Sequence, residues 1–147
     1  MTTLLSTELP PIIISAEDHQ TLAEIAMLAA ARKRQPAIAE VLAEELGRAE
    51  VVPKSSLPCD VVAMNSTVEY EDGVTDQVRR VTLVYPGEEE WDHNRVSVLS
   101  PIGAALIGLG EGQTMYWRTP LGGWRGLKVL RVLCPHRRLR AGGWSVA

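Results

Sequence analysis

The sequence predicts an α+β fold, in which an N-terminal antiparallel two-helix hairpin (a short coiled coil) precedes an antiparallel sheet with one short helix. Two observations lead to this fold class. Apolar residues recur at helical spacing over the first fifty positions, and short alternating segments bounded by turn residues follow from Cys59 onward. We expect three parts: a strand and the hairpin at 1–52, the sheet domain at 53–135 and a flexible tail at 136–147.

The helical hairpin is expected to begin after a short β-type run at 12–14. Ser15 should cap the first helix, with the Asp18 carboxylate reaching back to the cap N–H. The basic segment at 32–35 interrupts the pattern, and Pro36 is well placed to open the second helix. Each arm has roughly 14–15 residues, which corresponds to about 21–23 Å of helix. The apolar stripes that should pack the arms together are Leu22, Ile25, Ala26 and Ala29 in the first arm and Ile38, Val41, Leu42 and Leu46 in the second.

The pattern of the second part of the chain predicts short strands joined by turns. Prolines and serines at 51–58 indicate a linker, because helical periodicity stops there. Strands are then expected at 67–71, 79–85, 113–118 and 126–133, separated by turns rich in glycine and proline. Together they predict a compact sheet domain.

One run, at 96–108, predicts the end of a strand followed by a short helix. Ser100 is a good N-cap, because its hydroxyl can accept a hydrogen bond from an unpaired backbone N–H. Pro101 would occupy the first helical position, where its missing N–H costs nothing. Gly108 can adopt the left-handed conformation that ends a helix.

Charge is distributed unevenly, although the net charge is only −3. No acidic residue follows Glu111, whereas seven basic residues do: Arg118, Arg125, Lys128, Arg131, Arg137, Arg138 and Arg140. The asymmetry indicates a charged partner surface, and simple surface solvation explains it equally well. Cys59 and Cys134 lack metal-ligand spacing and are expected to be reduced thiols. Neither a leader nor a membrane span is evident, so we expect a soluble cytoplasmic protein.

Catalytic chemistry is not evident in the sequence. His19, His93 and His136 lie in different segments without ligand spacing. The acidic segment at 88–90 with Asp92 could bind a divalent cation weakly, but a solvated loop is the favoured interpretation. The glycines at 108–112 follow a helix and open a strand, which is the reverse of a phosphate-binding loop. We therefore expect no enzyme, no cofactor and no metal site.

Five segments carry a family resemblance: Pro-Ile-Ile-Ile at 11–14, Asp-Val-Val-Ala-Met-Asn-Ser at 60–66, Arg-Val-Thr-Leu-Val-Tyr-Pro at 80–86, the run at 96–112 with its Ser-Pro-Ile-Gly, and Pro-Leu-Gly-Gly at 120–123. In these segments the chain resembles the Gre transcript-cleavage factors of bacterial RNA polymerase. It is still more similar to the nucleoside diphosphate kinase regulator (Rnk) family, whose members carry the same C-terminal domain behind a shortened hairpin. The resemblance implies an FKBP-like fold for the sheet domain.

The resemblance also implies a partner. Gre-like factors dock through the C-terminal domain on the rim of the polymerase secondary channel and insert the hairpin into the channel. The rim contact lies at the strand-to-helix corner, which here is Leu99, Ser100 and Pro101. Cleavage factors carry an acidic pair at the hairpin tip that holds a second Mg²⁺, and such a metal pair activates water.

This sequence departs from the cleavage factors at the hairpin tip. The tip is Arg32, Lys33 and Arg34, and no Asp or Glu occurs from 25 to 39. Cationic side chains offer no oxygen ligands and repel the metal ion. The resemblance and the tip together predict a non-enzymatic regulator that binds RNA polymerase near the secondary channel, modulates elongation and competes with cleavage factors.

Other interpretations remain open at this point. An FKBP-like domain could bind peptides or isomerise prolyl bonds, with Trp117 and Trp124 as the only plausible pocket walls, although core packing is favoured for both. Direct contact with a nucleoside diphosphate kinase has no residue to support it, and an indirect effect through transcription fits as well. Weak nucleic-acid contact could come from the basic tip and from the basic segment at 136–140.

Overall fold

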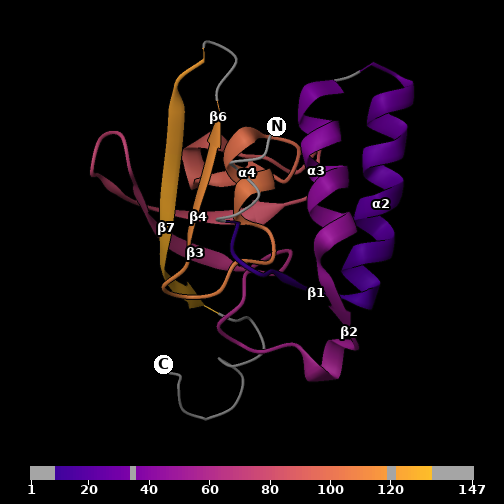
Figure 1. Cartoon of the computed structure of the whole chain (residues 1–147), viewed down its shortest axis with the longest axis horizontal. Helices are drawn as coiled ribbons and strands as arrows, with labels where there is room; N and C mark the ends of the chain where they lie inside the picture. The colour runs from indigo at the N-terminus through magenta and orange to yellow at the C-terminus, as the bar shows by residue number, and fades with distance from the viewer. Residues whose placement is uncertain (1–8, 34–35, 119–121, 134–147) are drawn as a thin grey trace.

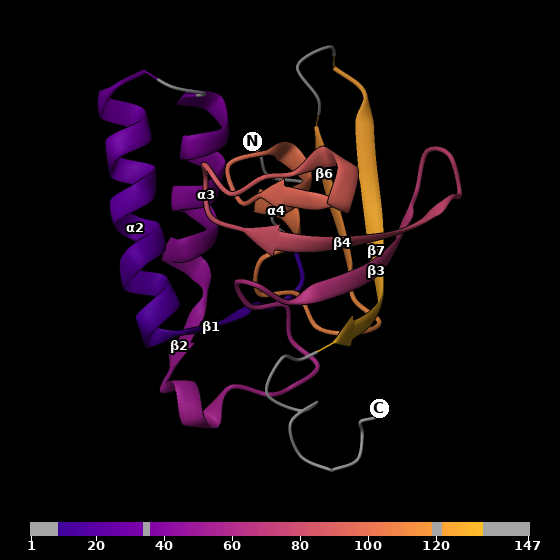
Figure 2. The ribbon, with the colours of Figure 1, turned by 180° about the vertical axis from the view of Figure 1, so that it is seen from behind.

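The protein consists of a pair of helices that packs beside a curled five-stranded sheet, as Figure 1 and, from behind, Figure 2 show. The computed structural model describes residues 9–33, 36–118 and 122–133. Arg34, His136, Cys134 and the predicted tail at 136–147 lie outside the described residues. The predicted α+β class is confirmed, because helices and a curled sheet share one hydrophobic core.

The two helices are α2 (Ala16–Ala31) and α3 (Pro36–Arg48), so Pro36 opens the second helix as predicted. Ser15 caps α2 by accepting a hydrogen bond from the Asp18 N–H at 3.1 Å. The predicted stripes are correct for most of their members, but Val41 is 40% exposed and was wrongly assigned to the packed face. Ala39 takes its place in the interface because small side chains let the two helices approach closely.

The base of the helix pair is held by a second, two-stranded sheet. Strand β1 (Ile13–Ser15) runs parallel to β2 (Glu50–Val52), and a 3₁₀ turn, η1 (Lys54–Ser56), follows. The prediction of a linker at 51–58 was therefore wrong for its first residues. Their alternation was too short to be distinguished from a loop, and the pairing partner lies more than thirty positions earlier in the chain.

The main sheet has the strand order β5-β4-β3-β7-β6. Its strands are β3 (Thr67–Asp72), β4 (Val78–Val84), β5 (Arg95–Ser97), β6 (Thr114–Arg118) and β7 (Trp124–Leu133). The prediction of a purely antiparallel sheet was wrong, because β5 pairs with β4 in parallel. The loop with the acidic side chains at 88–90, which we call the acidic loop, and the 3₁₀ turn η2 (Trp91–His93) carry the chain back along β4, so that β5 begins opposite Thr82.

The short helix α4 (Pro101–Leu106) lies between the sheet and the helix pair. The segment directly after α4 holds strand β1 in place. Gly108 has a φ of +85°, and its carbonyl accepts the Ile13 N–H at 3.1 Å. A Cβ at Gly108 would lie 2.8 Å from the Cβ of Ile12, so a side chain there would displace the strand.

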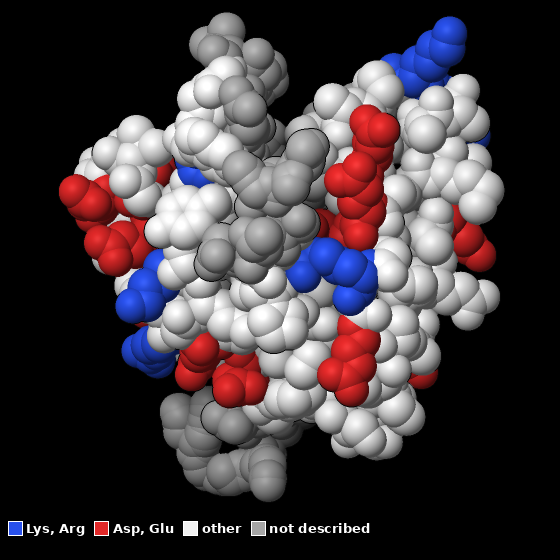
Figure 3. Space-filling model, in the orientation of Figure 1, with Lys and Arg blue, Asp and Glu red and all other residues white. Residues whose placement is uncertain are grey.

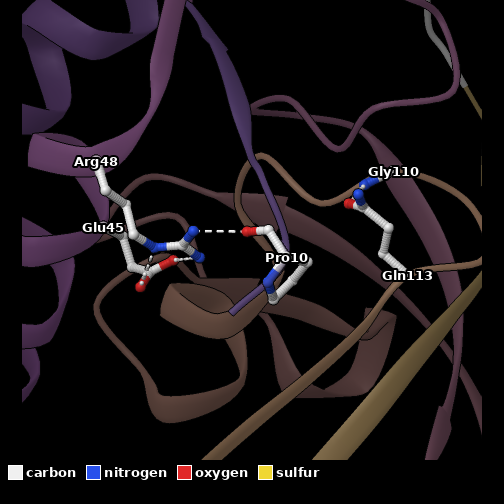
Figure 4. A network of polar contacts seen from close by, with 5 residues as sticks. All are labelled: Pro10, Glu45, Arg48, Gly110 and Gln113. Carbon is white, nitrogen blue, oxygen red and sulfur yellow. Dashed lines mark hydrogen bonds and ion pairs between the residues drawn. The ribbon is translucent and has the colours of Figure 1, made fainter. Parts of the chain in front are cut away.

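A buried ion pair joins α3 to the segment before β1. The guanidinium of Arg48 donates to both carboxylate oxygens of Glu45, at 3.1 and 2.8 Å, and its remaining arm donates to the Pro10 carbonyl (Figure 4). Glu45 is only 5% exposed, so this bidentate pair satisfies a carboxylate that would otherwise be costly to bury. The arrangement fixes the end of α3 relative to the segment before β1.

Candidate functional site

The strand-to-helix corner at Leu99 to Pro101 is held by a compact set of hydrogen bonds. The Ser100 hydroxyl accepts the Gly103 N–H at 3.0 Å and donates to the Ser97 carbonyl at 2.6 Å. The Ser97 hydroxyl accepts the Leu99 N–H at 2.9 Å. Each serine therefore satisfies a backbone group of the corner, and the predicted N-cap at Ser100 is confirmed.

Gly103 makes the corner tight. A Cβ at this position would lie 2.1 Å from the Ser97 carbonyl oxygen and 2.8 Å from the Cα of Val98. Only glycine allows α4 to approach the end of β5 this closely. The corner is consequently a rigid feature of the fold, on which Pro101 is exposed and Leu99 and Ser100 are half-buried.

A groove of about 690 Å³ lies between the corner and α2, and we call it the docking groove after the role that we propose for it below. One wall is formed by α2 and the other by the end of β4, the acidic loop and the corner. Its lining residues are Thr21, Ile25, Leu28, Ala29 and Arg32 on the helix and Tyr85, Pro86, Gly87, Glu88, Glu89, Ser97 and Leu99 opposite.

The docking groove brings together two of the residues predicted from the sequence, Leu99 of the corner and Arg32 of the tip. Ser100, Pro101 and Lys33 are not among its lining residues. Sequence reasoning missed Leu28, which is 53% exposed although apolar. Its position just off the packed stripe of α2 was the signal that could have identified it.

Asp18 links the α2 wall of the groove to the sheet domain. Its carboxylate accepts hydrogen bonds from the Met64 N–H and the Tyr85 hydroxyl, each at 3.3 Å. The predicted bond back to the cap N–H is therefore not the role of this side chain, because the sheet domain offers two donors instead. Burial, followed by the charge of Asp18, raises the pKa of Tyr85 to about 12, so the phenol remains a donor throughout the physiological range.

The described tip of the hairpin carries exposed cations. Arg32 ends α2, and Lys33 has a φ of +54° in the turn that follows. Figure 3 shows a basic side chain at this tip and acidic side chains farther along α3, where Glu40 and Glu44 are exposed. No group of three or more His, Cys, Asp or Glu within the described ranges could hold a metal ion.

The histidine and the acidic segment considered in the sequence analysis have contacts that are typical of structural roles. The Nε2 atom of His19 lies 3.0 Å from the Leu46 carbonyl, which links the two helices. The acidic side chains at 88–90 are exposed, and Glu90 pairs with Arg95 at 3.2 Å. A second groove, of about 700 Å³, lies between α2 and α3. Five of its eleven lining residues are alanines, and none belongs to the predicted corner or tip.

The two tryptophans proposed as pocket walls lie on opposite faces of the sheet. Trp117 is opposite Arg125 in the ladder between β6 and β7, and Trp124 is opposite the neighbouring Arg118. Since successive residues of a strand point to opposite faces, the two indoles cannot line one pocket. Trp117 is half-buried and packs against the core, whereas Trp124 is 47% exposed, so the expectation of core packing was wrong for Trp124.

Comparison with known proteins assigns both parts of the chain. Residues 57–133 match the family described as "Transcription elongation factor, GreA/GreB, C-term". The chain belongs to the GreA/GreB family of transcription elongation factors. Residues 10–52 match the "Rnk N-terminus" family, so the helix pair is that of the Rnk branch. The resemblance found in the sequence is thereby confirmed.

Individual relatives agree with this assignment. The "Regulator of nucleoside diphosphate kinase" of Escherichia coli (strain K12) is 40% identical over 95 residues, which cover 65% of this chain and 70% of the relative. The transcription elongation factor GreA of Syntrophobacter fumaroxidans is 34% identical over 123 residues, with 82% and 78% covered. The solved GreA/GreB factor of Nitrosomonas europaea matches with a TM-score of 0.63 at 32% identity, covering 84% of this chain and 98% of that one.

As a member of the GreA/GreB family with an Rnk N-terminus, the chain is similar to transcription elongation factors. None of the helices that the structure describes has the length and apolar content needed to cross a lipid bilayer.

Proposed function

We propose that the protein is a non-enzymatic regulator that binds RNA polymerase at the rim of the secondary channel and modulates elongation in the cytoplasm. The contact is made by Leu99, Ser100 and Pro101 together with the docking groove beside them. The observation that carries this proposal is the rigid corner, which the Ser97 and Ser100 hydroxyls and the absence of a side chain at Gly103 hold in one conformation. A preorganised surface of this kind loses little entropy on binding.

Each of the three parts of the chain has its own role in this proposal. In this proposal residues 53–135, with an FKBP-like fold, form the docking domain, residues 1–52 present the effector hairpin to the channel, and 136–147 is an appended tail. The helix pair spans about 20–24 Å at the helical rise, and its tip carries Arg32 and Lys33. A short arm with a cationic tip supports occupancy of the channel mouth without transcript cleavage.

Competition with cleavage factors follows from a shared docking position. A protein that fills the rim site without supplying a metal ligand reduces cleavage by exclusion alone. The link to nucleoside diphosphate kinase in the name of the Escherichia coli relative is then, for this chain, an indirect consequence of altered transcription.

The docking proposal is tested by binding of fluorescently labelled protein to purified bacterial RNA polymerase. Two adjacent exposed residues of α2 form a matched pair, because Leu28 lines the docking groove and Met27, which is 68% exposed, does not. Leu28→Glu should weaken binding at least about tenfold, since a carboxylate would be placed against an apolar contact. Met27→Glu should leave binding within about twofold.

A milder change, Leu99→Ala, should weaken binding in the same direction without changing the charge. Excess unlabelled cleavage factor should displace the labelled protein. Equal binding by the Leu28 and Met27 variants, or binding that excess cleavage factor does not disturb, would contradict the docking proposal.

A further inference from the structure

The face of the sheet that points away from the core, which we call the outer sheet face, carries a feature that polymerase docking does not use. Every second residue of β7 points outward, beginning with Trp124, Gly126 and Lys128. A bulge in the pairing with β3 then shifts the alternation by one residue, so that Arg131 also points outward. Figure 1 shows β6 and β7 at the side of the molecule away from α2 and α3. None of these residues lines the docking groove.

Tyr116 of β6 lies flat against this face. It is opposite Gly126 in the ladder, and a Cβ at Gly126 would meet the Cδ1 and Cε1 atoms of the tyrosine ring at 2.6 and 2.7 Å. The ring therefore covers the glycine with one side and remains 56% exposed. Covering a strand glycine is a known packing device, but it leaves the second π-face of the ring open to solvent.

Trp124 lies diagonally beside this ring. It is two residues before Gly126 on the same face of β7 and is 47% exposed. Diagonal cross-strand neighbours are roughly 7–8 Å apart, so the two aromatic residues occupy adjacent positions of this face, which we call the aromatic platform. Exposed aromatic residues at neighbouring positions of an open sheet are the arrangement on which single-stranded bases stack.

Cations continue the platform along β7. Lys128 and Arg131 are exposed, and neither forms an ion pair with another described residue. Two acidic side chains share the face: Glu69, which pairs with Arg80 at 3.5 Å, and Glu71, which is opposite Lys128 in the ladder. Both are half-buried, whereas the cations project into solvent.

The sequence that follows β7 is basic as well, with Arg137, Arg138 and Arg140 and no acidic residue after Glu111. Six of the fifteen Lys and Arg residues of the chain thus lie on or after β7, in a stretch without any acidic residue, although the net charge of the chain is −3. This charge asymmetry, which polymerase docking leaves unexplained, is complementary to a polyanion.

We propose that the outer face of β6 and β7 binds single-stranded nucleic acid, with two bases stacked on Tyr116 and Trp124 and the phosphates near Lys128 and Arg131. A duplex fits this face poorly, because its bases are already stacked on one another and only its phosphates are available. The site goes beyond polymerase docking and does not depend on it.

The test measures fluorescence anisotropy of labelled 12-nucleotide oligo(U) and oligo(dT) with the purified full-length protein at low salt, with a duplex of equal length for comparison. Both single strands should bind more tightly than the duplex. Tyr116→Thr and Trp124→Thr should each weaken binding by between about 5-fold and 100-fold, the range found for loss of one base stack. Tyr116→Phe, which keeps the ring, should bind like the original protein.

Charge variants provide the second arm of this test. Lys128→Glu should weaken binding and reduce its salt dependence, since a phosphate contact releases a counterion. Lys33→Glu makes the same charge change at the hairpin tip and should have little effect. Thermal unfolding checks that each variant is folded.

Three results would overturn the proposal: equal affinity for duplex and single strand, unchanged binding by folded Tyr116→Thr and Trp124→Thr, or loss of binding only in Lys33→Glu. If the two aromatic variants bind oligonucleotides normally but lose RNA polymerase, the face is a protein contact and the proposal is wrong. No polymerase is present in the oligonucleotide measurements, so their failure is distinguishable from failure of the docking proposal.

Discussion

The corner at Leu99 to Pro101 and the hairpin tip at Arg32 and Lys33 contribute to the same groove, yet the structure holds them in opposite ways. At the corner, the Ser97 and Ser100 hydroxyls bond to three backbone groups, and a required glycine lets the helix approach the strand closely. At the tip, the Arg32 and Lys33 N–H groups donate to backbone carbonyls of α2, and both cationic side chains are exposed. The difference is consistent with the proposal that the corner is the binding surface, and it means that the tip can change its chemistry without altering the fold.

The largest effect is expected from a side chain at the corner. Gly103→Ala should lower the free energy of unfolding by about 3 kcal/mol, because its Cβ would lie 2.1 Å from the Ser97 carbonyl oxygen. Gly47→Ala is the matched control in α3, where nothing lies within 4 Å of the added Cβ. It should instead raise stability by about 0.5–1 kcal/mol. Urea unfolding of both variants measures the difference, and similar effects would show that the corner is not tight.

A smaller loss is expected at the base of the helix pair. Arg48→Met should lower the free energy of unfolding by about 2 kcal/mol, since the buried Glu45 carboxylate loses its bidentate partner. Adding Glu45→Leu in the same chain should recover most of the loss, because no buried charge then remains. If the double variant is no more stable than the single one, the loss has another cause than the unpaired carboxylate.

The helix cap at the corner should contribute less again. Ser100→Ala should cost about 1 kcal/mol, because the Gly103 N–H loses its acceptor. Ser55→Ala, at an exposed position in the turn after β2, should stay within about 0.5 kcal/mol of the original protein. Thermal unfolding compares the two variants. An equal loss of stability in both would show that the Ser100 cap does not stabilise the corner.

The dependence of stability on pH should report the burial of Tyr85 beside Asp18. The phenol ionises near its ordinary pKa of 10.0 when the chain is unfolded, but at about 12 in the folded protein. Its stabilising contribution is therefore complete below pH 10 and is lost as the pH rises from 10 to 12. Tyr85→Phe should show a smaller fall in stability over this window. An identical fall in both proteins would mean that Tyr85 is not buried beside Asp18 in solution.

The smallest effect on stability is expected at the tip. Arg32→Glu with Lys33→Glu should change the free energy of unfolding by less than about 0.5 kcal/mol, because both side chains are exposed. The same double variant should weaken the regulatory effect on transcription more than it weakens polymerase binding. If binding falls to the same extent, the tip is an anchor and the contrast with the corner fails.

The sequence was sufficient for local features and insufficient for features that depend on distant pairing. Ser15, Pro36 and Ser100 were identified from their capping chemistry, which acts within a few residues. The parallel pairing of β5 with β4, and of β1 with β2, depends on where long connections return, so it could not be predicted from local patterns. The apolar pattern likewise could not show that Val41 faces solvent.

The candidate site shows the same division. The motif at the corner was found because its residues are adjacent in the chain. The docking groove joins α2 to segments some sixty positions later, and only the fold brings Leu28, Tyr85 and Leu99 together. Asp18 has the spacing of a capping box, but its carboxylate bonds to the sheet domain instead.

The central claim, docking without cleavage, is tested most directly by transcript cleavage in stalled, backtracked complexes of bacterial RNA polymerase. The protein alone should leave cleavage at the intrinsic rate of the polymerase, and increasing amounts should suppress the cleavage that an added cleavage factor stimulates. Leu28→Glu should lose this suppression, while Met27→Glu keeps it. Stimulation of cleavage by the protein alone, or failure to suppress the added factor at any concentration, would contradict the account.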